Sequence, residues 1–308
     1  MTENNRGLRL IERLRCRRLG AVGDERRGRW RWHFRGARRG TAVSSSEYWD
    51  RVAQPMAKKP HYLDAFLAAQ KRQAYLGLIE RWGGAPTTGR VLKTDLFEEA
   101  MGPDAFLLDL TNSAGSAVGI DVSSAIVRQA QDRDRSRLVR YVAADVRRLP
   151  FADGAFALIV SPSTLDHFPD PSDLGRSLHE LARVLEPGGR LIITLDNRQN
   201  IFDPLLRLTS WLRWTPYYLG RSYRVEELRA ELTAAGLLVQ QTTAILHNPR
   251  LTAVTAVAIA NKLNWPALTA LLRRTLVGAQ RLERTRWCYY TGSFVAAKAI
   301  RHVEPGHE

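Results

Sequence analysis

Two aspartates follow short apolar runs, at positions where a carboxylate can bind a nucleoside. Asp121 ends the run "SAVGID", and Asp145 ends the run "LVRYVAAD". A carboxylate after the first run can accept hydrogen bonds from both hydroxyls of a ribose. A carboxylate after the second can accept one from an adenine amino group, while the amide of Val146 donates to a ring nitrogen. A lone aspartate after a strand is commonly a turn or capping residue, so the interpretation rests on the occurrence of both.

Side chains that could act on a substrate follow a third apolar run. The stretch "FALIVSPSTLDHF" places Ser161 at the end of an expected strand, with Asp166 and His167 just beyond it. An imidazole, with an ordinary pKa of about 6.5, can take a proton from a nucleophile at neutral pH. His167 is therefore the candidate catalytic base, and shaping the pocket is its alternative role. Asp196 and Asn197, in "TLDN", are expected to face the same side.

Alternating strands and helices must position these side chains. Seven apolar runs are expected as strands: "RVLKTD", "SAVGID", "LVRYVAAD", "FALIVS", "RLIITLD", "LLVQQTTAIL" and "GSFVAAKAI". Several are apolar at nearly every position, as strands covered on both faces must be. Helical stretches separate most of them. The pattern predicts a doubly wound α/β domain, in which ligands sit at the carboxyl ends of the strands.

Four of these stretches, in series, resemble the class I S-adenosylmethionine-dependent methyltransferases, in particular the small-molecule "type 11" group. They are "GIDVS", "ADVRRLPFADGAFALIVS", "LHELARVLEPGGRLIIT" and "VEELRAELTAAGL", within residues 91–238. The resemblance implies a mostly parallel, seven-stranded, Rossmann-like sheet and S-adenosylmethionine as cofactor. It also implies that Asp121 binds the ribose and that Asp145 and Val146 bind the adenine. Ser161, at the end of its strand, is predicted to bind the cofactor as well.

The first motif departs from that family. After the strand, the family has an acid and a run of glycines, because only a backbone without side chains can lie against the cofactor. This chain has "VLKTDLFEEAMG" from Val91 to Gly102. Lys93 could bind the carboxylate of the cofactor's methionine end, and Asp95 its ammonium. The alternative is a purely structural turn in a degraded half-site.

The domain is expected to span residues 44–308, with helices over 44–89. The stretches 197–224 and 247–290 exceed what the core needs and are expected as insertions over the substrate side. The first insertion carries an apolar face beside arginines, formed by Leu205, Leu208, Trp211, Leu212 and Trp214. This face predicts either a packed substrate lid or an interfacial helix that admits a lipid-like acceptor from a membrane.

The positive charge of the chain is concentrated at its start. The formal net charge is +15, and residues 1–43 contain thirteen arginines and four acidic residues, a net of +9. Their low aliphatic content predicts disorder. A nucleic-acid arm, an anionic-membrane anchor and a targeting sequence are possible roles for the segment. We expect it to have no essential role.

The cysteine content and the apolar runs bear on the compartment. Cys16 and Cys288 are the only cysteines, which excludes a disulfide framework and a cysteine-rich zinc site, and no metal is expected. The longest apolar run, "LTAVTAVAIA", is too short to cross a bilayer. The sequence predicts a cytoplasmic protein, with peripheral membrane contact as an open alternative.

Four functions fit these observations to different degrees. The first is methyl transfer to a small-molecule or lipid-like acceptor, and the second is a non-catalytic relative that has lost its cofactor and binds partners. A nicotinamide-dependent oxidoreductase is disfavoured, because no G-x-G-x-x-G follows a strand. A nucleic-acid methyltransferase is disfavoured because "SPST" stands where a base-flipping Asn-Pro-Pro-Tyr tetrad would be. No specific nucleic-acid partner is therefore expected.

Overall fold

The folded core is built on one seven-stranded sheet. The computed structural model describes residues 20–22, 33–35, 45–56, 63–84, 87–212 and 219–302. The chain divides into two compact units, Met1–Tyr48 and Trp49–Glu308. In the first unit, β1 (Gly20–Val22) pairs antiparallel with β2 (His33–Arg35). The rest of segment 1–43, for which disorder is predicted, lies outside the described residues.

The sheet of the second unit has the strand order β5-β4-β3-β6-β7-β9-β8. Its strands are β3 (Thr87–Lys93), β4 (Ala114–Asp121), β5 (Val139–Ala143), β6 (Phe156–Pro162), β7 (Leu185–Asp196), β8 (Leu237–Ile245) and β9 (Phe294–Arg301). All neighbours pair in parallel except β9, which runs antiparallel to β7 and β8. The predicted mostly parallel, doubly wound sheet is confirmed, and each of the seven apolar runs forms a strand.

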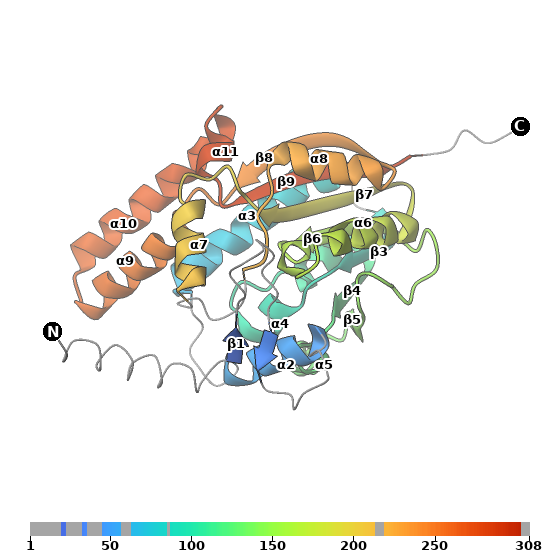
Figure 1. Cartoon of the computed structure of the whole chain (residues 1–308), viewed down its shortest axis with the longest axis horizontal. Helices are drawn as coiled ribbons and strands as arrows, with labels where there is room; N and C mark the ends of the chain where they lie inside the picture. Colours follow the sequence, from blue (N-terminus) through green and yellow to red (C-terminus); the bar gives the residue numbers. More distant parts are fainter. Residues whose placement is uncertain are drawn as a thin grey trace, which may run out of the picture. The chain divides into compact units, whose positions relative to one another are not determined.

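Helices cover both faces of this sheet (Figure 1). One face carries α6 (Ser172–Val184) and α8 (Val225–Ala234), and the other carries α3 (Ala65–Gly83), α4 (Phe97–Met101) and α5 (Ser124–Arg133). Because successive side chains of a strand point to opposite faces, β6 sends Ile159 to the α6 side, and Leu158 and Val160 to the α3 side. This explains why the strand is apolar throughout.

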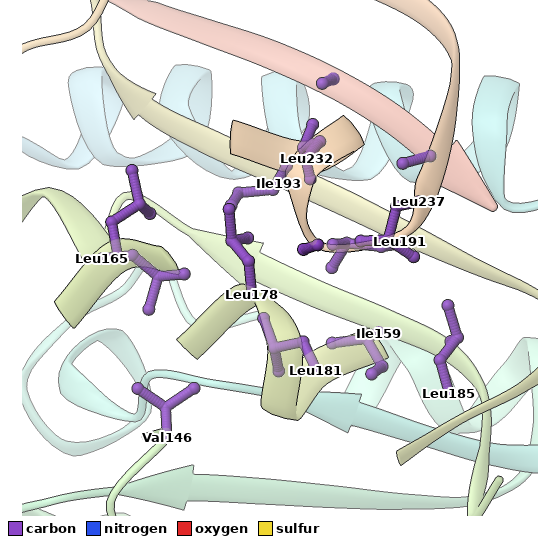
Figure 2. Close-up of a cluster of buried hydrophobic side chains, with 14 of the residues drawn as sticks. Val146, Ile159, Leu165, Leu178, Leu181, Leu185, Leu191, Ile193, Leu232 and Leu237 are labelled. Atoms are coloured by element: carbon purple, nitrogen blue, oxygen red, sulfur yellow. The ribbon is translucent and has the colours of Figure 1, made fainter. Parts of the chain in front are cut away.

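The larger core lies between the sheet and helices α6 and α8. Leu178 and Leu181, three residues apart on α6, lie in this cluster with Ile193 and Ile159 of the sheet (Figure 2). Leu232 adds a contact from α8. All five side chains are fully buried. A helix stripe of this spacing places its apolar side chains on one face, and here that face packs on the central strands that lead to the site.

The two sequence insertions form helices. The first contains α7 (Asp203–Trp211), and residues 213–218 of it lie outside the description. The second forms α9 (Arg250–Lys262) and α10 (Pro266–Ala279), which run side by side in Figure 1, then η3 (Gln280–Arg284) and α11 (Cys288–Thr291). No helix among the described residues has the length and apolar character needed to span a bilayer.

Candidate cofactor and acceptor site

The carboxyl ends of the parallel strands bring the predicted polar residues to one edge of the sheet. Lys93 ends β3 and pairs in register with Gly119 of β4 and Val160 of β6. Asp121 ends β4, and Ser161 is the penultimate residue of β6. The strand order reverses beside β3, which is where ligands bind in open α/β sheets. The residues are therefore grouped where a ligand would bind, while their individual roles stay predictions.

The side chain of Lys93 is completely buried and is held by internal acceptors. Its Nζ donates to Glu98 Oε2 at 3.1 Å, to Glu99 Oε2 at 2.7 Å and to the carbonyl oxygen of Asp95 at 2.5 Å. A second cation, Lys71, lies 2.8 Å from Glu98 Oε1. Burial alone would lower the pKa of Lys93, but the two glutamates outweigh it and hold that pKa above its ordinary value. The ammonium therefore stays charged.

This ion cluster takes the place of the glycines in the turn after β3. An ammonium group has three hydrogens to donate, and the three acceptors around Lys93 account for all of them. A bond from Lys93 to a ligand carboxylate would require one of these bonds to break. The geometry therefore favours Lys93 as the residue that ties the turn to α4. Its direct contact with the cofactor remains a prediction without support from this arrangement.

Two carboxylates lie at the corner between β3 and β4. Asp95 Oδ1 accepts a hydrogen bond of 2.6 Å from the amide of Phe97, the first residue of α4. Asp121 accepts from Ser123 N at 2.8 Å and from Leu96 N at 3.2 Å. Burial raises the pKa of Asp95 to about 6, and burial together with the charge of Asp95 raises the pKa of Asp121 to about 8. A cation or a hydroxyl donor in this corner would stabilise both ionised carboxylates.

Asp145 is bound by Arg147, a residue that the sequence analysis did not select. Arg147 Nε lies 3.0 Å from Asp145 Oδ1, and Arg147 Nη2 lies 2.6 Å from Oδ2. The other arm of the guanidinium reaches Asp173 at 2.7 Å, and the group lies over the ring of Phe168. Burial alone would raise the pKa of Asp145, but the hydrogen bonds from Arg147 outweigh burial and lower that pKa below its ordinary value. An adenine amino group would share this carboxylate with Arg147. The side chain of Val146 points into the core (Figure 2).

Ser161 joins the turn after β3 to β6. Its side chain is buried, and its Oγ accepts from Thr94 Oγ1 at 2.9 Å. The amide of Thr94 also donates to the carbonyl of Val160 at 3.1 Å. These bonds give Ser161 a structural role beneath the site, and its predicted contact with a cofactor stays a prediction.

His167 lies against an aromatic residue from the start of the folded unit. It belongs to η2 (Leu165–His167), directly after β6. Its ring is 5.6 Å from that of Trp49, centroid to centroid, at an interplanar angle of 70°. Such edge-to-face packing is favourable and orients the imidazole. Trp49 belongs to α2 (Ser45–Met56), in which Asp50 accepts from Ala125 N at 3.2 Å. Nothing local in the sequence indicates this contact.

Asp166 is a buried acid beside His167. Its Oδ2 accepts from Ser163 Oγ at 2.9 Å and from Asp196 N at 2.7 Å. Its Oδ1 lies 3.9 Å from His167 Nε2 and has no hydrogen-bond partner among the residues that the structure describes. Burial raises the pKa of Asp166 to about 6. The carboxylate of Asp166, when ionised, can stabilise a positive charge on His167 after a proton transfer.

A small hollow, with a cavity volume of about 20 Å³, lies next to this edge, between α7 and the start of α9. Leu205 and Leu206 line it from α7, and Arg250 lines it from α9. Arg250 also pairs with Asp196 at 2.5 Å between Nη2 and Oδ1. Asn197 lines the hollow as well, and its Nδ2 is held by main-chain carbonyls. The lining combines apolar side chains with polar groups, as acceptor sites commonly do.

Comparison with known proteins agrees with the fold and the motifs. A family described as "Methyltransferase domain" matches residues 98–193. The demethylmenaquinone methyltransferase of Mycolicibacterium gilvum is 30% identical over 200 residues, which cover 65% of this chain and 73% of that one. The ubiquinone/menaquinone biosynthesis C-methyltransferase of Haemophilus ducreyi is 33% identical over 103 residues, covering 32% and 38%. The malonyl-[acyl-carrier protein] O-methyltransferase of Pseudescherichia vulneris is 31% identical, covering 46% and 52%. The chain thus spans about half or less of these last two relatives.

Solved structures share the fold at low sequence identity. A structure described as a complex of the Haloferax volcanii Trm112 methyltransferase activator and a putative methyltransferase has a TM-score of 0.57 and 16% identity, covering 85% of this chain and 100% of that one. A Thermotoga maritima structure, described as an S-adenosylmethionine-dependent methyltransferase, has a TM-score of 0.51 and 17% identity, covering 83% and 99%. At these identities the likeness concerns the fold alone.

Proposed function

The chain belongs to the class I S-adenosylmethionine-dependent methyltransferases, and on that premise we propose that it transfers a methyl group to a small-molecule or lipid-like acceptor. The observation that carries the proposal is the pair of carboxylates, Asp95 and Asp121, at the corner where the strand order reverses. The pair supports a ligand that brings both positive charge and hydroxyl groups.

The residues at this corner fit the family's cofactor, S-adenosylmethionine. The molecule carries ribose hydroxyls, an ammonium and a sulfonium, so it offers both hydroxyl donors and positive charge. Asp121 would hold the ribose, and Asp95 would hold the ammonium. Asp145 would receive the adenine amino group beside Arg147. The cofactor supplies an electrophilic methyl group when it is bound, and the protein supplies position and proton acceptance.

The acceptor side is assigned to His167 and its neighbours. His167 would accept the proton that the nucleophilic atom of the acceptor loses as that atom takes the methyl group from the sulfonium of bound S-adenosylmethionine, which leaves S-adenosylhomocysteine. Asp166, 3.9 Å from Nε2, stabilises the imidazolium that results. Trp49 fixes the orientation of the ring. Alignment of nucleophile and methyl group supplies much of the rate in such displacements, so a rigid arrangement here serves the reaction directly.

The hollow between α7 and α9 is the proposed entrance for the acceptor. Leu205 and Leu208 of α7 are exposed, at 43% and 48% of their surface, so an apolar wall continues outside the hollow. This supports an acceptor with an apolar portion. The names of several relatives, which refer to ubiquinone and menaquinone biosynthesis, also favour this class.

A non-catalytic protein of the same fold is the second candidate. The observation that favours it is the buried cluster of Lys93, Glu98 and Glu99, which replaces the glycine-rich turn of the family. Such a protein would keep the sheet and lose the cofactor. Cofactor binding separates the two candidates.

Isothermal titration with S-adenosylmethionine and S-adenosylhomocysteine tests the proposal. We expect both to bind, and Asp121→Ala to weaken binding by about 1.5–3 kcal/mol, because the ribose loses a charged acceptor. Asp132→Ala is the matched control, since Asp132 is an exposed carboxylate on the neighbouring α5. Absence of binding by the wild-type protein would favour the non-catalytic candidate. Wild-type affinity in Asp121→Ala would exclude the assigned ribose contact.

A further inference from the structure

The positive charge of the folded unit is concentrated in the α9–α10 hairpin and the turn that follows it. Residues 250–286 contain seven cationic side chains and one acidic side chain, a net of +6. The rest of residues 44–308 carries no net charge, because 26 cationic side chains balance 26 acidic ones. The single acid, Glu283, is bound by Arg81 at 2.5 Å. Six of the seven cations are exposed: Lys262, Arg273, Arg274, Arg281, Arg284 and Arg286.

Large apolar side chains are exposed on the same hairpin. Five of them show more than half of their surface to solvent: Ile259 (51%), Leu263 (62%), Trp265 (56%), Leu271 (61%) and Val277 (56%). Leu263 and Trp265 lie at the turn between α9 and α10, where Asn264 has a φ of +48°. Single exposed apolar residues are ordinary on protein surfaces, but a group of five on one hairpin indicates a contact surface.

The inner side of the hairpin is already used for packing. Val257 of α9 and Leu276 of α10 are buried against Leu67 of α3. This contact anchors the hairpin to the folded unit and leaves its outer residues exposed. The exposed apolar side chains are therefore separate from the buried side chains that pack the hairpin on α3.

We propose that the α9–α10 hairpin docks on an anionic lipid bilayer, with Leu263, Trp265 and Leu271 entering the headgroup region. Interfacial helices combine apolar side chains that enter the boundary with cations that attract anionic lipid. Tryptophan is enriched at this depth, because its ring is apolar and its N–H is polar. Each exposed cation near the surface adds to the attraction. The inference goes beyond the proposed reaction and does not depend on it.

The composition of the surface favours a bilayer over other partners. Nucleic acid would engage the cations, but it offers nothing to exposed aliphatic side chains such as Ile259 and Val277. A second copy of the chain would bring a second set of like charges to the same contact, at a cost in repulsion. An anionic bilayer satisfies the apolar and the cationic side chains together.

Co-sedimentation of the full-length protein with vesicles tests this proposal. The vesicles are phosphatidylcholine alone, or phosphatidylcholine with phosphatidylglycerol, at low and high salt. The double variant Leu263→Gln/Leu271→Gln removes apolar surface without changing charge. The matched control is Leu138→Gln/Leu238→Gln. Leu138, 62% exposed, lies just before β5, and Leu238, 55% exposed, lies on β8, so neither belongs to the hairpin. The basic segment 1–43 is present in every variant, so its contribution cancels.

We expect the wild-type protein to bind the anionic vesicles, and to bind them less at high salt. The hairpin double variant should bind at least about tenfold more weakly, because two apolar side chains no longer enter the boundary. The control should match the wild type, and both variants should keep its melting temperature. Equal binding by hairpin variant and wild type would overturn the proposal, and so would equal binding to neutral and anionic vesicles. No vesicle binding, with self-association that the hairpin variant abolishes, would instead assign the surface to a second copy.

Discussion

The carboxylate of Asp95 lies close enough to that of Asp121 for its charge to help raise the pKa of Asp121 to about 8. Burial raises the pKa of Asp95 itself to about 6. In the cofactor-free protein, ionisation of this pair is therefore costly near neutral pH. A cationic ligand would remove part of that cost, which links the electrostatics of the corner to the proposed cofactor.

The stability of the cofactor-free protein should fall as the pH rises, because of Asp121. Its folded-state pKa lies above the ordinary value of 3.8, so the folded chain holds this proton more tightly than the unfolded chain does. The resulting stabilisation is full below the ordinary pKa and is lost as the pH rises through the folded value near 8. Asp121→Asn removes this titration. The melting temperature of Asp121→Asn should rise relative to that of the wild type as the pH approaches 8. The difference should be about 2–4 °C for each kcal/mol of unfolding free energy that the wild type loses.

Thermal unfolding across this pH range measures the difference. Asp132→Asn, at an exposed position of α5, should follow the wild type at every pH. Parallel curves for Asp121→Asn and the wild type would show that the Asp121 carboxyl is not perturbed by burial and by Asp95.

Lys93 should be essential to stability. Lys93→Met leaves Glu98 and Glu99 buried without their shared cation, and removal of one partner from a buried ion pair costs about 3–5 kcal/mol. Urea unfolding should show this loss, and Lys262→Met, at an exposed lysine, should not. Adding Glu99→Gln to Lys93→Met should recover part of the loss. A mild effect of Lys93→Met would mean that Lys93 is exposed to solvent or ligand.

Asp95 should distinguish the two ends of the cofactor. Asp95→Ala should weaken the binding of S-adenosylhomocysteine more than the binding of adenosine, because adenosine has no amino-acid end for Asp95 to contact. Loss of a desolvated charged contact costs about 2–5 kcal/mol of binding free energy. Titration of both ligands gives the gap in affinity. Lys93→Ala, measured where it remains folded, should narrow the gap only if Lys93 reaches the carboxylate. Equal losses for the two ligands would indicate a collapsed pocket.

Gly220 should tolerate no side chain. It has a φ of +68°, and a Cβ there would lie 1.8 Å from the carbonyl oxygen of Asp166. Arg221 N also donates to that oxygen at 2.8 Å, so the two segments cannot easily separate. Gly220→Ala should therefore destabilise the protein by about 1–3 kcal/mol and displace η2 with His167. Gly278→Ala is the control, because nothing lies within 4 Å of its Cβ position, and a stable Gly220→Ala would refute the close approach.

Removal of residues 1–43 should leave the folded unit intact, whereas removal of residues 1–56 should not. The longer deletion takes away Trp49, which packs on His167, and Asp50, which binds Ala125. A chain that begins at Ser44 should keep its melting temperature and its affinity for S-adenosylmethionine. A large loss in either would assign a structural role to the basic segment.

The strands and their ends could be predicted because the signal for them is local. A strand covered on both faces must be apolar throughout, so runs such as "FALIVS" are visible without any tertiary information. A parallel sheet then places the last residue of each run, including Asp121 and Ser161, at one edge. The sequence by itself therefore determined the sheet and the set of residues at its carboxyl edge.

The partners of those residues were decided by the tertiary structure alone. Lys93 has the chemistry to bind a ligand carboxylate, and only its full burial between Glu98 and Glu99 shows that its donors are used inside the protein. Trp49 reaches His167 from a helix far away in the chain, and no spacing in the sequence records that contact. The pKa of Asp121 likewise depends on how deeply it lies and how near Asp95 comes. Local pattern reports which face of an element is apolar, whereas the charge and hydrogen bonding of a site depend on distances that exist only once the chain has folded.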